Sequence, residues 1–406
     1  MTTPFLNRLK RLVDSNDLAW TLPLPPWAPH RERAVRHLRQ VARRGLRRRL
    51  VADRGWGAVL VQSAAWPLLA GLKAWLAARA PLPAGGPQRS WIDLWWVQLA
   101  HNLRISDQQM LAFALPAQRA HVNLSLPCCE HQVLMDLINR NTGLPEIEDK
   151  RGFARFCAQH GLPTIGVLVE SDGRQVVQFQ PLPAAELFLK PADRGCGEGI
   201  STLPFAPAQG GWRGSAGETL PAAAVADYAI RLQAGHPWIL QLRRHNSPAW
   251  AAFSPGALCT LRVVTGRAAP HAPVELIGSF MRFPRGAAIV DNIACGALSA
   301  DVDLATGRLG PARDATDAGI DIATHPDTGA DIAGVVIPAW DQVRALALQA
   351  HAPISRFALI GWDIALLDGA PALVEMNLNW GVFTNTPLGR TRYPEITAAW
   401  LGALHP

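Results

Sequence analysis

Residues 361–377, GWDIALLDGAPALVEMN, carry two carboxylates and a side-chain amide at spacings that could hold a cation. Asp368 and Gly369 stand between two apolar runs, a pattern that predicts a β-hairpin. With Gly369 at the centre of the turn, Asp363 lies opposite Glu375, and like charges that face each other across two strands destabilise a sheet. A bound cation would remove that repulsion.

Strand alternation places Asn377 on the same face as Glu375. Carboxylate and amide oxygens are hard ligands that favour Mg²⁺ and leave other coordination positions to water or phosphate. The alternative is a surface hairpin whose carboxylates point into water, but the flanking runs are too apolar for an exposed strand. The prediction is therefore a magnesium site formed by Asp363, Glu375 and Asn377. The opposite face is expected to be core, formed by Trp362, Ile364, Leu366 and Val374.

Lysine is rare in this chain: among 39 basic residues the only lysines are Lys10, Lys73, Lys150 and Lys190. A lysine retained in so arginine-rich a chain is a candidate for a specific role. Lys190 ends the apolar run ELFLKP, from which its ammonium could reach a phosphate. Lys150 is expected in the first turn of a helix, where the alternative is an ordinary surface lysine.

The sequence DRGCGEG, residues 193–199, follows the strand expected to end at Lys190. Glycine lets backbone amides approach phosphate oxygens without steric clash. The run lacks the lysine and hydroxyl residue of a Walker loop, and no helix opens at its end as a dinucleotide fingerprint requires. It predicts a phosphate-binding turn through Gly195, Gly197 and Gly199.

Helices and strands must position these residues. The pattern of apolar and polar residues changes near Lys150. Residues 1–145 read as mainly helical, whereas the rest mixes short strands and helices with many hairpins. That mixture predicts an α+β fold and not a doubly wound sheet. Helices are expected at 31–50, 91–115, 130–139, 221–234 and 338–350. Strands are expected at 186–191, 200–204, 238–242, 260–265, 274–282, 359–366 and 371–377, with surface loops at 209–219 and 310–334.

The composition is that of a globular chain, with 406 residues, 49% hydrophobic content, 17% charged content and a formal net charge of +7. These values exclude an intrinsically disordered chain. Six cysteines without a metal-binding or disulfide spacing predict reduced thiols. The N-terminus lacks a secretory signal pattern, so the expected location is the cytoplasm, with association to a membrane left open.

Arginines occupy most faces of the helix expected over residues 31–50. The preferred interpretation is a solvated basic helix, and the alternatives are contact with an anionic lipid surface or an acidic partner. No aromatic–basic interleaving accompanies the charge, so nucleic acid is not an expected partner. For the apolar residues 55–72 a buried helix is preferred to membrane-surface contact, and a span is least favoured.

The ordered series of motifs resembles the ATP-grasp superfamily: DK before a helix ending in GLPT, a strand ending in KP, the glycine run, WILQ, TLRVVT, VDN and the hairpin GWD to VEMN. The segments at 282–311 and 325–343 look most like the sugar-transfer-associated ATP-grasp branch, related to α-glutamate ligases. The resemblance covers about Glu148 to Phe383. It implies two α+β lobes, 146–237 and 238–406, that sandwich ATP behind a helical region, 1–145.

The resemblance also implies roles for individual positions. Lys150 and Lys190 would contact ATP phosphates, and the loop of Gly195, Gly197 and Gly199 would fold over them. Gln241 and Leu242 would bind the adenine edge. Two Mg²⁺ ions would be held by Asp363, Glu375 and Asn377. Catalysis would use Lys190 with three further residues, of which Arg262 would neutralise the transferring phosphoryl group and Arg282 and Asn292 would contact the carboxylate substrate.

The implied reaction is ATP-dependent joining of a small-molecule carboxylate to an amine, or a related nucleophile, through an acyl phosphate. Such chemistry needs positioning and charge neutralisation and no side-chain nucleophile. Two alternatives remain on the same fold. One is phosphoryl transfer to a hydroxyl of a sugar or lipid-linked substrate, and the other is a non-catalytic nucleotide-binding scaffold.

Overall fold

A computed structural model describes residues 21–79, 90–111, 113, 116–139, 149–195, 197–254, 256–286, 288–293, 296–314, 320–367, 370–378, 380 and 387–404. The expected turn residues Asp368 and Gly369 lie outside this set, as do Cys196, Cys295 and the two ends of the resemblance, Glu148 and Phe383. The four described cysteines, at positions 128, 129, 157 and 259, are free thiols, which agrees with the expectation.

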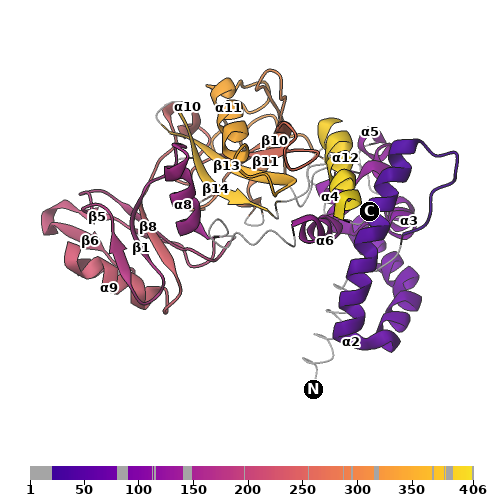
Figure 1. The fold of residues 1–406 in the computed structure, drawn as a ribbon, viewed down its shortest axis with the longest axis horizontal. Coiled ribbons are helices and arrows are strands. Elements are labelled where there is room, and N and C mark those ends of the chain that lie inside the picture. Colours follow the sequence, from indigo (N-terminus) through magenta and orange to yellow (C-terminus); the bar gives the residue numbers. More distant parts are fainter. Residues whose placement is uncertain are drawn as a thin grey trace.

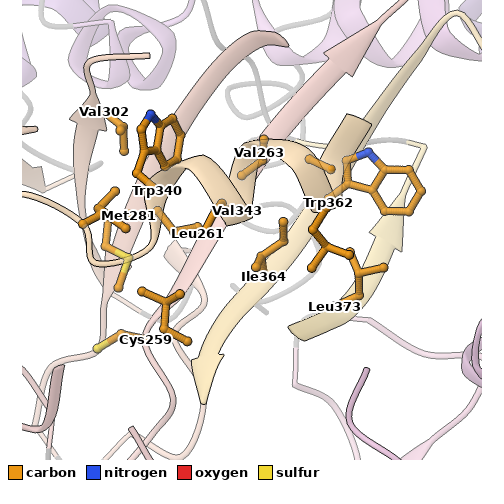
Figure 2. Packing of buried hydrophobic residues seen from close by; sticks show 14 of the residues in the cluster. Cys259, Leu261, Val263, Met281, Val302, Trp340, Val343, Trp362, Ile364 and Leu373 are labelled. Atoms are coloured by element: carbon orange, nitrogen blue, oxygen red, sulfur yellow. The ribbon is translucent and has the colours of Figure 1, made fainter. Parts of the chain in front are cut away.

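The larger sheet has six antiparallel strands in the order β12-β11-β10-β9-β13-β14. Its strands are β9 (Thr260–Gly266), β10 (Glu275–Phe283), β11 (Leu298–Val302), β12 (Leu309–Asp314), β13 (Leu359–Leu367) and β14 (Ala370–Asn377). Every residue of β9 and β13 is buried, including the charged Arg262 and Asp363. One face packs on α11 (Trp340–His351) in a core that includes Leu261, Val343 and Trp362 (Figure 2).

The smaller sheet has five strands in the order β2-β1-β8-β3-β4. They are β1 (Val167–Ser171), β2 (Val176–Gln178), β3 (Leu187–Pro191), β4 (Ser201–Leu203) and β8 (Trp238–Leu242). A further small sheet joins β5 (Phe205–Ala206), β6 (Gly211–Arg213) and β7 (Thr219–Leu220) beside α9 (Ala222–Leu232), with the 3-10 turn η2 (Pro207–Gln209) between them. Figure 1 shows this lobe at one end of the molecule and the N-terminal helices at the other.

Two short helices lie next to the segments of chain that connect the two sheets: one precedes β1, and the other lies between β8 and β9. They are α8 (Lys150–Gln159), which contributes Phe153 and Phe156 to the core of the larger sheet, and α10 (Pro248–Ala251). Asp149 caps α8 by accepting from the backbone N–H groups of Arg151 and Gly152. Lys150 therefore stands in the first helical turn, as the sequence predicted.

The N-terminal helices cover part of the second face of the larger sheet, together with the C-terminal helix α12 (Pro387–Leu404). They are α2 (His30–Arg79), α3 (Trp91–His101), α4 (Ile105–Met110), α5 (Pro116–Arg119) and α6 (Cys128–Asn139), with the 3-10 turn η1 (Val122–Leu124). Residues of α2 and α6 pack in one cluster with Val264 of β9, Leu359 of β13 and Tyr393 of α12. The N-terminal region thus shares a core with the larger lobe.

Helix α2 folds back on itself at Gly55, whose φ of 78° and ψ of 160° only glycine adopts readily. Arg39 donates to the carbonyl of His101, and Ala70 accepts from Gln98. In a straight helix Arg39 and Ala70 would lie about 46 Å apart, yet their partners are three residues apart on α3. The two halves of α2, residues 30–54 and 56–79, therefore lie side by side and antiparallel.

The structure corrects several expectations of the sequence. Strand β8 pairs with β1 and β3, so the boundary between the lobes lies after Leu242 and not at Trp238. The helix expected over 91–115 ends at Asn102, which adopts the left-handed conformation, and resumes as α4. The expected loops at 209–219 and 310–334 contain β6 and most of β12, because these short strands carry a weak apolar pattern.

The arginine-rich half of α2 is not simply a solvated helix. Arg36, Arg39 and Arg43 are buried, and Arg39 and Arg43 both bind the buried carboxylate of Glu130 on α6. The Nε–Oε distances are 2.6 Å and 2.5 Å. The apolar residues 55–72 were expected to be buried, but most of their large side chains are exposed, including Leu68 at 81%.

Candidate functional site

A cleft between the two sheets collects most of the predicted site residues. The smaller lobe supplies Lys190, Gly195, Gly197, Gln241 and Leu242, the larger lobe supplies Arg282, Asn292, Asp363 and Glu375, and α8 supplies Lys150. The three predicted residues that do not line the cleft are Gly199, Arg262 and Asn377. Lys150 and Glu375, which are separated by more than 200 positions in sequence, thus line the same cleft.

One row of charged side chains lies across three strands of the larger sheet, and two of its members, Asp363 and Glu375, line the cleft. Asp363 on β13 is paired in register with Arg262 on β9 and with Glu375 on β14. In antiparallel sheets, directly opposed residues point to the same face. The prediction that Asp363 lies opposite Glu375 is therefore confirmed.

A β-bulge, and not the turn alone, creates that pairing. Near the turn Ala365 faces Ala372 and Ile364 faces Leu373, a register that would bring Val374 opposite Asp363. The register shifts by one residue between Ile364 and Asp363, so Val374 is the extra residue. Val374 lines the cleft instead of entering the core on the far face, which corrects the expectation for that residue.

Asp363 is buried and neutralised by two arginines. Arg262 binds it with both Nε and Nη2, at 2.5 Å and 3.2 Å, and Arg282 Nη2 lies 3.0 Å from Oδ2. Burial alone would raise the pKa of Asp363, but the two guanidinium groups outweigh it and hold the pKa below its ordinary value. Arg262 is thus a partner of Asp363 in this structure, and its predicted contact with a phosphoryl group stays a prediction.

Arg282 joins the row to a second acid, Asp291, which sequence reasoning missed. Asp291 accepts from the backbone N–H and the hydroxyl of Thr260 at 2.8 Å and 2.5 Å, and Arg282 lies 3.3 Å from its Oδ2. Burial raises the pKa of Asp291 despite these contacts. Asp291 directly precedes the predicted Asn292 in the VDN segment, which was the available signal.

The two lysines approach the row from the opposite wall. Lys150 Nζ lies 3.2 Å from Glu375 Oε1 and donates to the carbonyl of Arg194 at 2.6 Å. Lys190 is buried, and burial lowers its pKa to about 8. The positive charge of Lys150 acts in the same direction, while Glu375 and Asp363 oppose it. Both lysines that the sequence singled out are therefore in the cleft.

The glycine run closes over the cleft from the smaller lobe. Gly197 and Gly199 have φ values of +78° and +71°, where other residues are strained. A Cβ on Gly197 would lie 3.1 Å from Val290, on the segment of the larger lobe that also carries Asp291 and Asn292. The run therefore touches the opposite lobe. Arg194 and Glu198 form an ion pair of 2.6 Å across it.

The lining beyond the charged row is partly apolar. Gln241 is buried and donates through Nε2 to the carbonyl of Ile165 at 2.7 Å, which leaves its side-chain oxygen as an acceptor. Apolar walls are formed by Ile165, Phe188, Leu242, Leu258 and Ile289. Such a slot beside polar backbone groups can hold a flat aromatic ring.

The charge balance of the cleft favours a polyanion. Six basic and four acidic side chains line it, which leaves an excess of two positive charges. The basic residues not yet mentioned are Arg243 and Arg244. Arg243 is held by Glu186 at 2.6 Å at the cleft edge.

The donor set on β13 and β14 also fits a hard divalent cation. Asp363, Glu375 and Asn377 offer only oxygen ligands, and the amide nitrogen of Asn377 is buried without a hydrogen-bond partner. Among the described residues no group of three or more His, Cys, Asp and Glu side chains could hold a metal. A cation here would therefore use two carboxylates, the amide oxygen and ligands from a substrate.

Solved structures with partial similarity include D-alanine–D-alanine ligase from Bacillus anthracis complexed with ATP. It is 9% identical over 63% of this chain, which spans 65% of that chain, with a TM-score of 0.35. D-cycloserine synthetase is 15% identical over 66% of this chain and 73% of its own, with a TM-score of 0.35. The biotin carboxylase domain of 2-oxoglutarate carboxylase from Hydrogenobacter thermophilus, with MgADP and bicarbonate, is 11% identical over 62% of this chain and 45% of its own, also with a TM-score of 0.35.

The sequence matches none of the curated proteins with which it was compared. Residues 130–392 match the family described as sugar-transfer associated ATP-grasp. The match extends from α6, through both sheets and the cleft, into α12. It confirms the expected ATP-grasp fold and the expectation that the nucleotide is ATP. The chain therefore belongs to the sugar-transfer associated ATP-grasp family.

Proposed function

We propose that the protein is an ATP-dependent ligase that activates a small-molecule carboxylate as an acyl phosphate and joins it to an amine. The observation that carries the proposal is the cleft in which Lys150 and Lys190 face the row formed by Arg262, Asp363 and Glu375. ATP-grasp membership and ligase neighbours support an ATP-dependent ligase in general.

The basic residues of the cleft would reduce the repulsion between the two negatively charged reactants. A carboxylate and the γ-phosphate are both negative, so they approach each other only when fixed positive charges surround them. Lys150 and Lys190 would contact the phosphates from one wall, and Arg282 would orient the carboxylate from the other. The buried position of Lys190 and Arg282 strengthens these interactions because few waters compete.

The bonds exchange in two steps. A carboxylate oxygen attacks the γ-phosphorus, the bond to the β-γ bridging oxygen breaks, and ADP leaves with that electron pair. The amine nitrogen then attacks the acyl carbon, the bond to the phosphate oxygen breaks, and phosphate leaves as the nitrogen loses a proton. No side chain becomes covalently attached at any stage.

Mg²⁺, when bound, would neutralise the β- and γ-phosphate oxygens during the transfer. Asp363, Glu375 and Asn377 would hold it, and Lys150 would give up its contact with Glu375 in favour of phosphate. Arg262 keeps Asp363 ionised through its bidentate contact, so that the carboxylate stays a ligand.

The glycine run would exclude water from the acyl phosphate. Gly195 and Gly197 line the cleft beside the larger lobe, and Gly199 provides the positive φ that lets the run turn. Asn292 lies on the facing segment and would contact the carboxylate substrate. Gln241 and Leu242 would border the adenine.

A screen of carboxylic acids crossed with amines tests the reaction directly. We expect ADP release that requires both substrates, together with an amide product in equal amount by mass spectrometry. A stable phosphorylated product formed without an amine would indicate phosphoryl transfer to a hydroxyl instead. Mg-ATP binding without turnover across the panel would indicate a scaffold. Retention of all three predicted metal donors argues against the scaffold.

The lowered pKa of Lys190 predicts that nucleotide affinity depends on pH. Only the protonated ammonium attracts phosphate, so affinity should fall as the pH rises through about 8. Calorimetric titration with ADP and Mg²⁺ from pH 7 to pH 9.5 measures this. Lys190→Arg should flatten the profile because arginine stays charged. Lys190→Met should weaken binding by roughly 10- to 100-fold and also remove the dependence. Identical profiles for wild type and Lys190→Met would refute the role of Lys190.

A further inference from the structure

The second half of α2 packs along one side only. Its buried residues follow helical spacing and face α3 and the first half of the helix: Val59, Gln62, Trp66, Ala70 and Ala74. The Trp95 indole donates to the carbonyl of Pro67, and Gln98 donates to that of Ala70. This side of the helix therefore has its partners within the chain.

The opposite side is apolar and exposed. Most of its large side chains are separated by three, four or seven residues, which places them on one side of the helix. They are Leu60, Val61, Leu68, Leu72, Trp75 and Leu76, with exposures between 40% and 81%. Trp91, Ile92 and Trp96 of α3 are exposed as well. These nine residues are called the apolar face below.

Charge is almost absent from this segment. Between residues 56 and 78 the only charged residue is Lys73, and its ammonium lies over the ring of Trp66, 5.7 Å from the centroid. The helix contains a stretch long and apolar enough to cross a membrane by length and composition, yet only 28% of that stretch is buried. A core helix of a soluble protein would be mostly buried, so packing within the chain does not explain this composition.

Basic residues stand at the tip of the folded-back helix, where the apolar stripe begins. Arg44, Arg47 and Arg48 line one depression with Trp56, which is 60% exposed. No ion pair between described residues involves these three arginines, in contrast to the nearby Arg49, which pairs with Asp136. Cationic and apolar surfaces are therefore contiguous.

We propose that the apolar face and these three arginines form a docking surface for a bilayer that contains anionic phospholipid. The apolar face would enter the boundary between headgroups and acyl chains, and the arginines would contact the phosphates. Tryptophan is enriched at that depth because its ring is apolar and its N–H is polar. Four tryptophans of α2 and α3, Trp56, Trp75, Trp91 and Trp96, are exposed.

The helix lies in the plane of the membrane and does not span it. A spanning helix must present an apolar surface on all sides that meet lipid. Here the antiparallel first half carries arginine along its length, and the packed side of the second half buries the polar Gln62. A protein partner, or a second copy of this chain, would need acidic groups opposite Arg44, Arg47 and Arg48, and anionic headgroups supply that charge directly.

Sedimentation with vesicles tests the proposal on the full chain. We expect the protein to pellet with vesicles of phosphatidylcholine and phosphatidylglycerol, and much less with phosphatidylcholine alone. The binding should weaken as salt is added because the arginine contacts are screened. Equal partition to both vesicle types, or none to either, would overturn the proposal.

Two sets of variants separate the contribution of the arginines to vesicle binding from that of the apolar side chains. Changing Arg44, Arg47 and Arg48 together to Gln should weaken binding to anionic vesicles by roughly 100-fold. Changing Leu68 and Leu72 to Gln should weaken it by at least about tenfold. The matched charge control changes Arg174, Arg213 and Arg231, which are exposed in the smaller lobe, to Gln and should leave binding intact.

Sedimentation velocity without vesicles tests whether a second copy of this chain covers the apolar face instead of lipid. A monomer that binds vesicles supports the lipid assignment. A dimer that Leu68→Gln with Leu72→Gln converts to monomer, and that does not bind vesicles, would assign the apolar face to a second copy and overturn the proposal. Circular dichroism of each variant confirms that a loss of binding is not a loss of fold. None of these measurements depends on the ligase reaction.

Discussion

Glu375→Gln is expected to lower ATP-dependent ADP release by roughly 100- to 1,000-fold while leaving the fold intact. The side chain of Glu375 is 34% exposed, and its ion pair is with Lys150. Lys150 keeps its hydrogen bond to the carbonyl of Arg194 when this charge is removed, so it is not left without a polar partner. What the variant loses is half of the carboxylate pair that would hold the divalent cation against the phosphates.

Glu170→Gln is the matched control for that variant. Glu170 also binds a basic side chain, Arg155, at 2.9 Å, but it does not line the cleft. Activity should be unchanged in Glu170→Gln, and the thermal midpoints of both variants should stay near that of the wild type. Full activity in Glu375→Gln, measured by coupled ADP release at saturating Mg-ATP, would remove Glu375 from the metal site.

Asp363→Asn should behave differently, because Asp363 neutralises two buried guanidinium groups. The variant should lose activity and also about 3–5 kcal/mol of unfolding free energy, the usual cost of breaking a buried ion pair. Its carboxylate has a lowered pKa, so this stability is present above the unfolded pKa and is lost as the pH falls through the folded pKa. Urea denaturation at neutral pH separates the stability loss from the catalytic loss.

Glu130→Gln is expected to produce the largest loss of stability outside the cleft, about 3–5 kcal/mol. Glu130 is fully buried, and it is the carboxylate that binds both Arg39 and Arg43. Its replacement would leave two guanidinium groups charged in the core between α2 and α6. The variant should unfold at lower urea concentration with an unchanged dependence on denaturant.

Asp136→Asn on the same helix provides the comparison. Asp136 pairs with Arg49 at 2.8 Å, but both side chains are about half exposed, so the loss should not exceed about 1 kcal/mol. Arg39 and Arg43 outweigh burial and lower the pKa of Glu130. The contribution of Glu130 should therefore be complete at neutral pH and disappear as the pH falls through its folded pKa. Equal losses in the two variants would contradict the buried network.

The strands that form the cleft could be predicted from sequence because most of their residues are buried. Strands β3, β8, β9, β13 and β14 all lie within a residue or two of the expected ranges. Their clusters of apolar residues identify them even without a strictly alternating pattern. Strands β6 and β12 were harder to predict, because they have few apolar residues and depend on pairing with neighbouring strands for their extended conformation.

Some residues of the candidate site could also be predicted from sequence, and others could not. Lys150, Lys190, Asp363 and Glu375 were predicted from residue type and position, and all four line the cleft. Thr260 and Asp291 were missed because their network exists only when a strand and a distant segment meet. The pairing of Asp363 with Glu375 was predicted correctly, but from a turn geometry that omitted the bulge at Val374.

The sequence by itself determined which residue types are available for a site, since carboxylates, lysines and glycines at these positions limit the ligands that can bind. Only the tertiary structure decided how the charges combine. Arg262 and Arg282 became the partners of Asp363 because three strands place them on one face, and Arg39 and Arg43 became buried because α6 carries Glu130 to them. Gly55 folds α2 back and leaves its apolar side exposed. Such pairings depend on contacts between residues far apart in the chain, which local pattern and propensity do not encode.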